Sequence, residues 1–373
     1  MAEPGSGERA VQPRAVPTIS DVARHAGVSP MTVSRALSGG QNVSAPMRRK
    51  VEASVRALGY RRNENARSLR PGHRSGLVGV VVTNLANPYY AEVLEGIGEI
   101  LSEADRRVIF GTSHEDPEEE ARLIADFVGR QTEGLIVVPA GGPSEHLRPE
   151  QRHGVPLVFA SRRQDGVDVD AVIVDDVRGA ERVTALLLEE GHRRIAFVGN
   201  AVSVFTGQRR YEGFERAHRA AGVPVLPELV RRGQQDIHSA ENAARELLAL
   251  DEPPTAIFGA NNRNMVGAIK ALHAASAARG TDLFARVRLA SFDTFDLEEL
   301  VPGDLSVVTH DARELGRTAA ELLLVRLQGK RSDRPTRTIE LPTSIRTRRR
   351  AEETPRDAGA GPAASPAEPT PAT

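Results

Sequence analysis

The most constraining feature of this sequence is an alternation that begins at Gly76, where apolar runs bounded by turns are separated by helical patterns. The runs are rich in Val, Ile and Leu and lie at residues 76–82, 106–112, 134–140, 156–161, 171–176, 193–200, 228–233, 255–262 and 287–293. The helical patterns cover residues 91–104, 118–130, 178–190, 208–221, 238–249 and 265–275. Continuous apolar strands alternating with helices are typical of parallel sheets covered on both faces. Nine such strands predict two doubly wound parallel-sheet subdomains, with a ligand site in the cleft between them.

A different pattern precedes this alternation, because residues 18–60 indicate three short helices. Thr18 is a good N-cap with Asp21 three residues later, as in a capping box. Ser29 caps the second helix and Pro30 occupies its first position, where the missing N–H is not needed. Ser44 caps the third helix. Two helices joined by the short turn "AGVS" predict an all-α helix-turn-helix domain.

Composition divides the chain further. Residues 1–16 form an arm rich in Pro, Gly and charge, and the tail 348–373 lacks apolar periodicity, so both are expected to be disordered. Between them we expect a helix-turn-helix domain at 17–62, a linker or hinge helix at 63–74 and an effector-binding and dimerisation domain at 75–347. We assign 75–174 and 310–332 to its N-subdomain, and 175–309 and 333–347 to its C-subdomain.

Charge is distributed unevenly along the chain. Residues 14–74 hold twelve Arg and Lys against three Asp and Glu, although the whole chain has a net charge of −1. A basic block on an acidic body indicates a polyanionic partner, and the alternative is a solvated basic face. The sequence has no cysteine, no apolar leader core in its first 17 residues and no uncharged apolar run of ~18 residues. We therefore expect a cytoplasmic protein that does not engage a membrane.

The second predicted helix carries the clearest functional pattern. Val33, Ala36 and Leu37 recur at helical spacing and must face the core. The opposite face then presents Pro30, Met31, Ser34 and Arg35. A helix of this size fits the DNA major groove, where arginine reads guanine and apolar groups contact thymine methyls. Hydroxyls near helix N-termini hold phosphates, which indicates such a role for Thr18, Ser29, Thr32 and Ser44.

At this point the sequence resembles a known family. Residues 18–72, "TISDVARHAGVSPMTVSRALSGGQNVSAPMRRKVEASVRALGYRRNENARSLRPG", are similar to the DNA-binding head of the LacI/GalR family of bacterial transcription regulators. The segments "LANPYYAEVLEGIGE", "EEGHRRIAFVG", "RRYEGFERAHRAAG", "AIFGANN", "ASFDTFD" and "ELGRTAAELLL" extend the resemblance to about residue 347. It implies a periplasmic-binding-protein-like body and a homodimeric, effector-controlled regulator that binds a palindromic operator in double-stranded DNA, as a repressor in most members.

The resemblance also implies roles for residues that contact DNA. Pro30 and Met31 occupy the variable base-reading positions, although Pro30 could merely begin the helix. Asn63, Ala66 and Leu69 match the family's hinge helix, in which the leucine wedges into the minor groove and kinks the duplex. The alternative for Leu69 is docking onto the body, and Arg70 would read or neutralise the minor groove. Asn42 and Tyr60 complete the predicted DNA-binding set.

Family effectors bind in the cleft between the subdomains. The matching positions here are Asn87, Tyr89, Tyr90, Ser113, Ser161, Arg162, Arg210, Asp236, Ile237, Asn262 and Asp293. For each residue the alternative is a structural contact between the subdomains. Many members have Asp where Ser161 and Asn262 stand, and an aromatic residue where Ile237 stands. Neutral groups beside Arg162, Arg163 and Arg210 would make the pocket more positive, so we favour a sugar acid or sugar phosphate over a plain neutral sugar.

Two other classes of protein remain to be weighed. One is a sugar-binding transport component on the same fold, against which the fused head argues. The other is an α/β enzyme with a regulatory head, but no nucleophile, base and orienting residue stand in a recognisable pattern. We expect no enzyme activity, no cofactor and no bound metal. Residues 351–373 lack the leucine heptad through which some family members tetramerise, so we expect a dimer.

Overall fold

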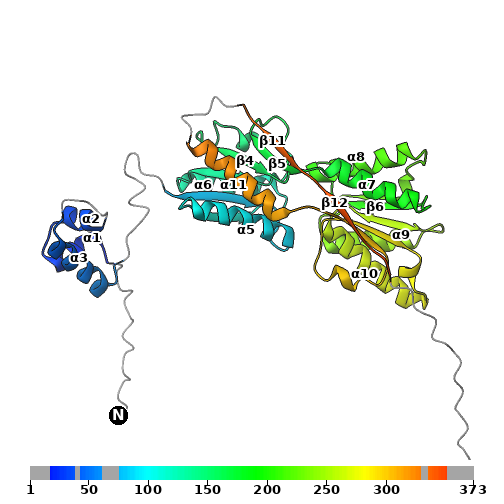
Figure 1. Cartoon of the computed structure of the whole chain (residues 1–373), viewed down its shortest axis with the longest axis horizontal. Coiled ribbons are helices and arrows are strands. Elements are labelled where there is room, and N and C mark those ends of the chain that lie inside the picture. The colour runs from blue at the N-terminus through cyan, green and yellow to red at the C-terminus, as the bar shows by residue number, and fades with distance from the viewer. Residues whose placement is uncertain (1–16, 38–42, 61–74, 329–334, 351–373) are drawn as a thin grey trace, which may run out of the picture. The chain divides into compact units, whose positions relative to one another are not determined.

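The computed structural model describes residues 17–37, 43–60, 75–328 and 335–350. The chain separates into two units, residues 1–75 and 76–373, which are treated separately here (Figure 1). The predicted DNA-contacting residues Asn42, Asn63, Ala66, Leu69 and Arg70 lie outside the described residues, so their roles remain predictions.

The described part of the first unit holds helices α1 (Ile19–Ala26), α2 (Pro30–Leu37) and α3 (Ala45–Leu58). The predicted capping box at α1 is present, because the Thr18 backbone N–H donates to Asp21 Oδ2 at 2.9 Å and Asp21 N–H donates to Thr18 Oγ1 at 3.4 Å. Gly27 then ends α1 in the left-handed conformation, with φ at 62°. Ser44 occupies the N-cap of α3, but its side chain makes no capping hydrogen bond, contrary to expectation.

Apolar side chains at helical spacing close this small unit. Its fully enclosed residues come from all three helices: Val22, Ala23, Ala26, Val33, Ala36 and Val51. Leu37 and Tyr60 pack against them from the edge. Val33 and Ala36 are buried as the spacing predicts, so the opposite face of α2 is directed away from the core.

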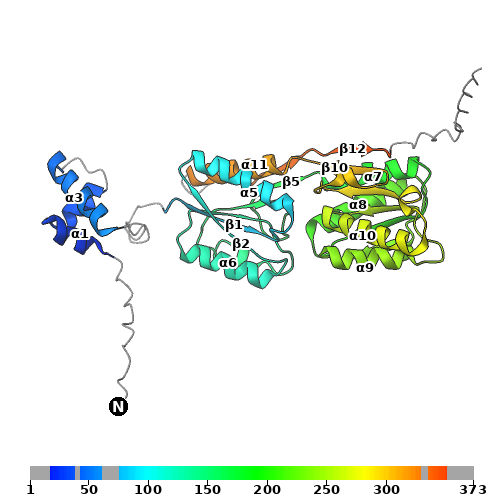
Figure 2. The same ribbon diagram turned by 90° about the horizontal axis from the view of Figure 1, so that it is seen from below.

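The second unit contains two six-stranded sheets (Figures 1 and 2). The first has the order β11-β5-β4-β3-β1-β2 and is parallel throughout. Its strands are β1 (Leu77–Val82), β2 (Arg107–Thr112), β3 (Gly134–Val137), β4 (Leu157–Ala160), β5 (Asp170–Val174) and β11 (Thr338–Leu341). Helices α5 (Pro88–Glu103) and α11 (Ala312–Gln328) cover one face, and α6 (Pro117–Gly129) covers the other (Figure 2).

The second sheet has the order β12-β10-β9-β8-β6-β7, and only β12 runs antiparallel to its neighbour among the described strands. Its strands are β6 (Ile195–Gly199), β7 (Val230–Arg232), β8 (Ala256–Gly259), β9 (Arg288–Phe292), β10 (Leu305–Thr309) and β12 (Ser344–Arg348). Helices α7 (Asp176–Glu189) and α8 (Phe205–Ala220) cover one face, and α9 (Ile237–Leu248) and α10 (Asn262–Arg279) the other (Figure 2). Each of the nine predicted runs contains a strand, whereas β10, β11 and β12 were not predicted.

The chain crosses between the two subdomains three times, after β5, after β10 and between β11 and β12. This topology corrects the boundary expected for the last segment. Residues 333–347 were assigned to the C-subdomain, but β11 pairs in parallel with β5 and belongs to the first sheet. Only β12 joins the second sheet, through β10.

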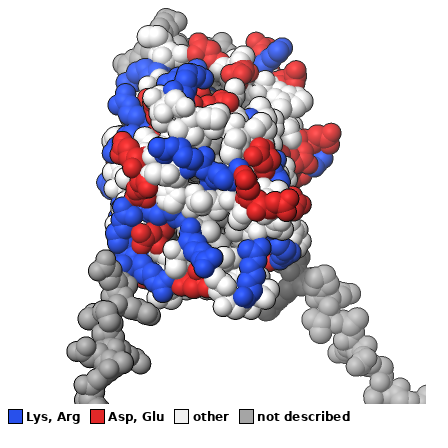
Figure 3. Space-filling model, turned by 90° about the vertical axis from the view of Figure 1, so that its right-hand side faces the viewer, with Lys and Arg blue, Asp and Glu red and all other residues white. Residues whose placement is uncertain are grey.

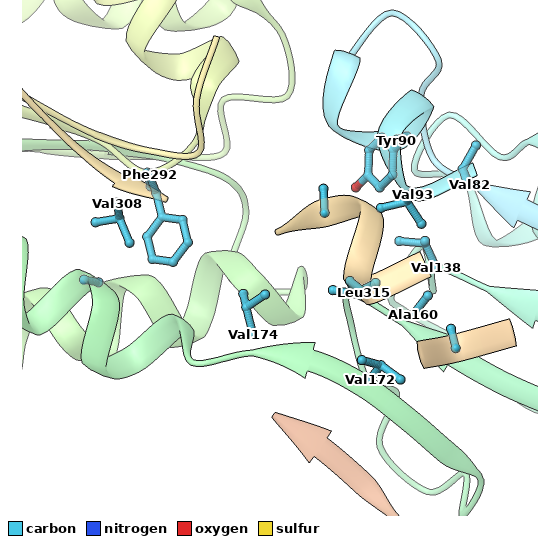
Figure 4. Close-up of a cluster of buried hydrophobic side chains, with 14 of the residues drawn as sticks. Val82, Tyr90, Val93, Val138, Ala160, Val172, Val174, Phe292, Val308 and Leu315 are labelled. Atoms are coloured by element: carbon cyan, nitrogen blue, oxygen red, sulfur yellow. The ribbon is translucent and has the colours of Figure 1, made fainter. Parts of the chain in front are cut away.

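One hydrophobic core continues through both subdomains. Figure 4 shows part of it, where Phe292 and Val308 of the second sheet approach Val174 and Leu315 of the first subdomain. Tight helix pairs border this core: a Cβ added to Gly96 of α5 would collide with the Arg313 carbonyl of α11. Glycine at this position therefore lets the two helices pack backbone to backbone.

Candidate DNA-binding surface and ligand cleft

The outer face of α2 presents the residues predicted to enter a DNA groove. Met31 is 62% exposed, Pro30 and Arg35 are also exposed, and Ser34 is partly buried. No carboxylate within the described residues pairs with Arg35. An exposed methionine beside a free guanidinium gives the helix both an apolar contact and a fork of donors for base edges.

The predicted phosphate-contacting hydroxyls differ in their availability. Ser29 Oγ accepts the Thr32 backbone N–H at 3.1 Å and lies 2.9 Å from Thr32 Oγ1, so these two residues cap α2. The Thr18 hydroxyl donates to Asp21 Oδ2 at 2.7 Å. Ser44 is exposed and makes no capping bond, which leaves its hydroxyl and the N-terminal amides of α3 open to an anion.

A small polar hollow, with a cavity volume of about 40 Å³, lies between the two subdomains of the second unit. Seven of the eleven predicted effector-binding residues line it: Asn87, Tyr89, Tyr90, Ser161, Arg162, Arg210 and Asp293. Glu115, from the family-matching segment 113–116, lines it as well, together with side chains that sequence reasoning did not select: Thr83, Asn84, Asn200, Thr206, Gln235, Asn261 and Arg263. Several of these follow the carboxyl ends of β1, β6 and β8, which is where parallel sheets bind ligands, so position alone offered a signal.

The other four predicted residues do not line the hollow. Ser113 is fully buried after β2. Asp236 is the exposed N-cap of α9, where it accepts the Ser239 N–H at 2.7 Å, and Ile237 begins that helix. Asn262 is buried and bridges the subdomains.

The bridge made by Asn262 joins two helix N-termini. Its Nδ2 donates to Asn87 Oδ1 at 2.8 Å and to the Thr294 carbonyl at 3.3 Å. Asn87 is the N-cap of α5, and the same Oδ1 accepts the Tyr89 N–H at 3.2 Å. One amide oxygen therefore ties the start of α5 in the first subdomain to the start of α10 in the second.

Arg162 forms the charged centre of the first wall. Its two terminal nitrogens donate to Glu115 at 2.6 and 2.9 Å, and further bonds reach the Pro139 carbonyl at 3.1 Å and the Tyr90 hydroxyl at 3.3 Å. Burial disfavours the charged guanidinium, but Tyr90 and Glu115 outweigh it and hold the pKa of Arg162 above its ordinary value. The bidentate carboxylate neutralises this arginine.

Arg210 holds the second wall together. It donates to Asp176 at 2.7 Å and to Asp293 at 2.9 Å, and its guanidinium lies 3.6 Å from the centroid of the Phe292 ring. Burial raises the pKa of both carboxyls, but Arg210 and a 2.8 Å bond from His310 bring the pKa of Asp293 down to about 2. For Asp176 burial prevails and its pKa is raised.

These ion pairs correct one premise of the sequence analysis. Arg162, Arg163 and Arg210 were expected to make the pocket positive. Arg162 and Arg210 are each compensated by carboxylates, and Arg163 is exposed and does not line the hollow. The expected excess of positive charge does not come from these residues.

Two family models match the chain. The model described as bacterial regulatory proteins of the lacI family covers residues 18–63. The model described as periplasmic binding proteins and sugar binding domain of the LacI family covers residues 75–346. The chain belongs to the LacI family. It is therefore a DNA-binding transcriptional regulator and not an enzyme, as its sequence predicted.

Individual LacI-family relatives match over most of their length. Catabolite control protein A of Priestia megaterium is 31% identical over 307 residues, which are 82% of this chain and 91% of the relative. The transcriptional repressor CytR of Escherichia coli K12 is 27% identical over 334 residues, 90% and 96% of the two chains. The structure of the transcriptional regulator CelR in complex with cellobiose is 28% identical, with a TM-score of 0.65, and the match covers 88% of this chain and 98% of that one.

The end of the body seen in Figure 3 carries Lys and Arg interspersed with Asp and Glu, so neither sign forms a continuous patch there. No described helix combines the length and apolar character needed to cross a bilayer. Within the described ranges, no group of three or more His, Asp and Glu side chains is placed to hold a metal ion.

Proposed function

We propose that this LacI-family regulator is a homodimeric repressor whose affinity for a palindromic operator is set by a small carbohydrate-type ligand in the cleft. The observation that carries the proposal is the polar hollow, whose two walls are joined by the Asn262–Asn87 bond, in the same chain as an exposed recognition helix. A ligand that binds between the walls changes their separation. Ligand binding then shifts the equilibrium between conformations of the body that differ in this separation, and the affinity of the head for DNA changes with it.

A second copy of the chain is proposed because α2 is short. Its eight residues contact only a few base pairs, and a two-fold dimer doubles the site while matching a palindrome. In the proposed complex, the hinge segment at 63–74 adds the Leu69 wedge. Sedimentation of the full chain at micromolar concentration should give a dimer, and a tetramer or a monomer would contradict this part of the proposal.

The ligand class rests on the chemistry of the cleft. Its walls offer amides, hydroxyls and two compensated arginines, which are the groups that recognise sugar hydroxyls in concave sites. The CelR relative was solved with cellobiose, a neutral sugar. The polar lining offers hydrogen-bonding groups for a neutral sugar and for an anionic sugar derivative alike.

The DNA-binding part of the proposal is tested with Arg35→Ala in the full chain, using operators selected from random double-stranded DNA. Loss of a bidentate base contact should weaken binding by about 1–3 kcal/mol and relax the preference at one base pair. Arg56→Ala is the matched control, since it removes an exposed arginine from α3 and leaves α2 intact. Equal losses in the two variants, with unchanged base preference, would show that Arg35 supplies only charge.

The part of the proposal that concerns effector control is tested by measuring operator affinity with and without saccharides that stabilise the body in a thermal-shift screen. A cleft ligand should change the affinity for DNA, and Arg35→Ala should leave ligand affinity unchanged. Ligands that stabilise the body without altering DNA binding would contradict the proposed coupling between the cleft and the operator.

A further inference from the structure

Arg263 is the third arginine that lines the cleft, and it is bonded differently from the other two. It follows Asn262 at the start of α10, and its backbone N–H donates to Asn262 Oδ1 at 2.8 Å. Across the described residues, its guanidinium makes no hydrogen bond and no ion pair. Its Nε is buried without a partner, whereas the side chain as a whole is only partly buried.

The neighbouring arginines of the cleft differ from Arg263 because both form ion pairs with carboxylates. The terminal nitrogens of Arg162 are paired with Glu115, although its Nε is also buried without a partner, and Arg210 is paired with Asp176 and Asp293. Those pairs leave no cleft carboxylate within ion-pair distance of Arg263. The buried Nε of Arg263 lacks a hydrogen-bond acceptor, which is unfavourable, and its terminal nitrogens have no protein carboxylate to compete with an anion that enters the hollow.

One carboxylate lies nearby but does not complete the pair. The pKa of Asp236 is lowered chiefly by hydrogen bonds from Ser239, and Arg263 adds to the effect from a distance. The two side chains do not come within the 4 Å of an ion pair. Asp236 is already engaged as the N-cap of α9, with the Ser239 N–H at 2.7 Å, so it stays beside the cleft rather than in it.

The groups around Arg263 are neutral and polar. Gln235, Asn200 and Asn261 line the same hollow, and Asn261 Nδ2 donates to Asn200 Oδ1 at 2.9 Å. Amides of this kind bind hydroxyls and do not compete for a guanidinium as a carboxylate would. The cleft thus combines a neutral polar surface with one guanidinium that no carboxylate of the described residues pairs with.

We propose that Arg263 binds an oxyanion of the effector, a carboxylate or a phosphate, while the neutral side chains of the cleft hold the rest of the ligand. This inference rests on the proposed function of the cleft and names the ligand class within it. Arg263 is then the residue that selects a sugar acid or sugar phosphate over the matching neutral sugar. It supplies the positive charge that Arg162 and Arg210 do not.

The first test needs no knowledge of the natural effector. Inorganic phosphate is titrated against the full chain at constant ionic strength, with the thermal midpoint as the readout. The expected result is a saturable, millimolar stabilisation that persists in Arg163→Met, removal of an exposed arginine outside the hollow, and disappears in Arg263→Met. Failure of phosphate to stabilise the wild type, or equal stabilisation of Arg263→Met, would overturn the proposal.

The second test separates the two anions and separates this inference from the regulatory one. Glucose, glucuronate and glucose 6-phosphate, with the matching galactose series, are titrated by calorimetry into wild type, Arg263→Met and Arg263→Lys. An anionic member should bind the wild type roughly 10- to 100-fold more tightly than its neutral partner. Arg263→Met should abolish that ratio, and Arg263→Lys should keep part of it. Which series binds identifies the carboxylate or the phosphate.

The outcomes of the two proposals differ. Release of DNA by neutral sugars, unaffected by Arg263→Met, would refute the oxyanion site and leave the regulator intact. Arg263-dependent anion binding without any change in operator affinity would refute effector control and leave the site intact. Circular dichroism and ligand-free operator binding of Arg263→Met establish that the variant is folded.

Discussion

Replacing Arg210 by methionine tests how the second wall of the cleft is held together. In the folded protein this guanidinium bonds Asp176 at 2.7 Å and Asp293 at 2.9 Å, and all three side chains are buried. Methionine fills much of the same volume, so the main loss is electrostatic. Two carboxyls stay in a buried setting, and only His310 remains to bond one of them.

The expected cost follows from leaving buried charges without their partner. Breaking one side of a buried ion pair costs about 3–5 kcal/mol, more than the intact pair contributes over an apolar replacement. Contact of Arg210 with the Phe292 ring is lost as well. At a urea dependence of about 3 kcal/mol per molar, the unfolding midpoint of the body should fall by about 1–1.7 M.

The cost of the Arg210→Met substitution is expected to depend on pH in a definite direction. In the wild type the folded pKa of Asp293 is about 2, below its ordinary value of 3.8, so its ionised form stabilises the protein above pH 4 and this contribution is lost as the pH falls. Without Arg210, burial raises the folded pKa of Asp293, and that of Asp176 rises further. The destabilisation is then greatest at neutral pH, and protonation relieves it as the pH falls. The gap between variant and wild type should be wide at pH 8 and narrower at pH 5.

Urea unfolding of the full chain followed by circular dichroism at pH 5 and pH 8 measures that gap. Arg209→Met is the matched control, because Arg209 lies on the same helix but reaches Glu340 only at 3.6 Å, in a partly exposed pair. Its cost should stay below about 1 kcal/mol at both pH values. An Arg210→Met cost below about 1 kcal/mol, or one that does not change with pH, would refute the electrostatic reasoning.

Three further outcomes are expected. Gly96→Ala places a methyl group against the facing backbone of α11 and should abolish soluble folded protein. Gly98→Ala meets open space on the same helix, so this control should fold and gain up to about 1 kcal/mol of stability in thermal unfolding. Equal behaviour of the two variants would contradict the close approach of α5 and α11. Thr18→Ala removes a capping box and should lower the stability of the head by about 1 kcal/mol, read as a lower midpoint of head unfolding by calorimetry, and no change would mean that the cap is redundant. Asn262→Ala breaks the bond to Asn87 and should raise hydrogen exchange at the start of α5 without altering that of the head; unchanged exchange there would show that the bond does not hold the cleft.

Much of the architecture can be predicted from local patterns in the sequence. Continuous Val and Ile runs such as β1 and β5 predicted buried parallel strands, and Thr18 with Asp21 predicted the first cap. The strands that escaped prediction include β11 and β12, "TIEL" and "SIRTR", whose alternating polar residues reflect partly exposed edges. Edge strands lack the continuous apolar run of a doubly covered strand, so their signal in the sequence is weak.

The candidate cleft was predicted in outline but not in its pairing. Seven of the eleven residues selected for the cleft line the hollow, but the partner of Arg162 stands 47 residues away and one partner of Arg210 stands 83 residues away. No spacing rule connects such residues, because the topology of two sheets brings them together. For the same reason Arg263 was overlooked: its lack of a partner is visible only once every other charge has been placed.

The last two strands have a consequence for synthesis of the chain on the ribosome. Strand β5 is made early, yet its outer neighbour β11 and the helix α11 that covers the first sheet follow strands β6 to β10 of the second sheet along the chain. The buried carboxylate of Asp170 likewise stays unpaired until Arg326 and the backbone N–H of Arg337 have been made. A nascent chain that stops before residue 326 therefore exposes an unfinished sheet edge and an unpaired acid, so the first subdomain to be translated cannot finish folding before most of the second has been made.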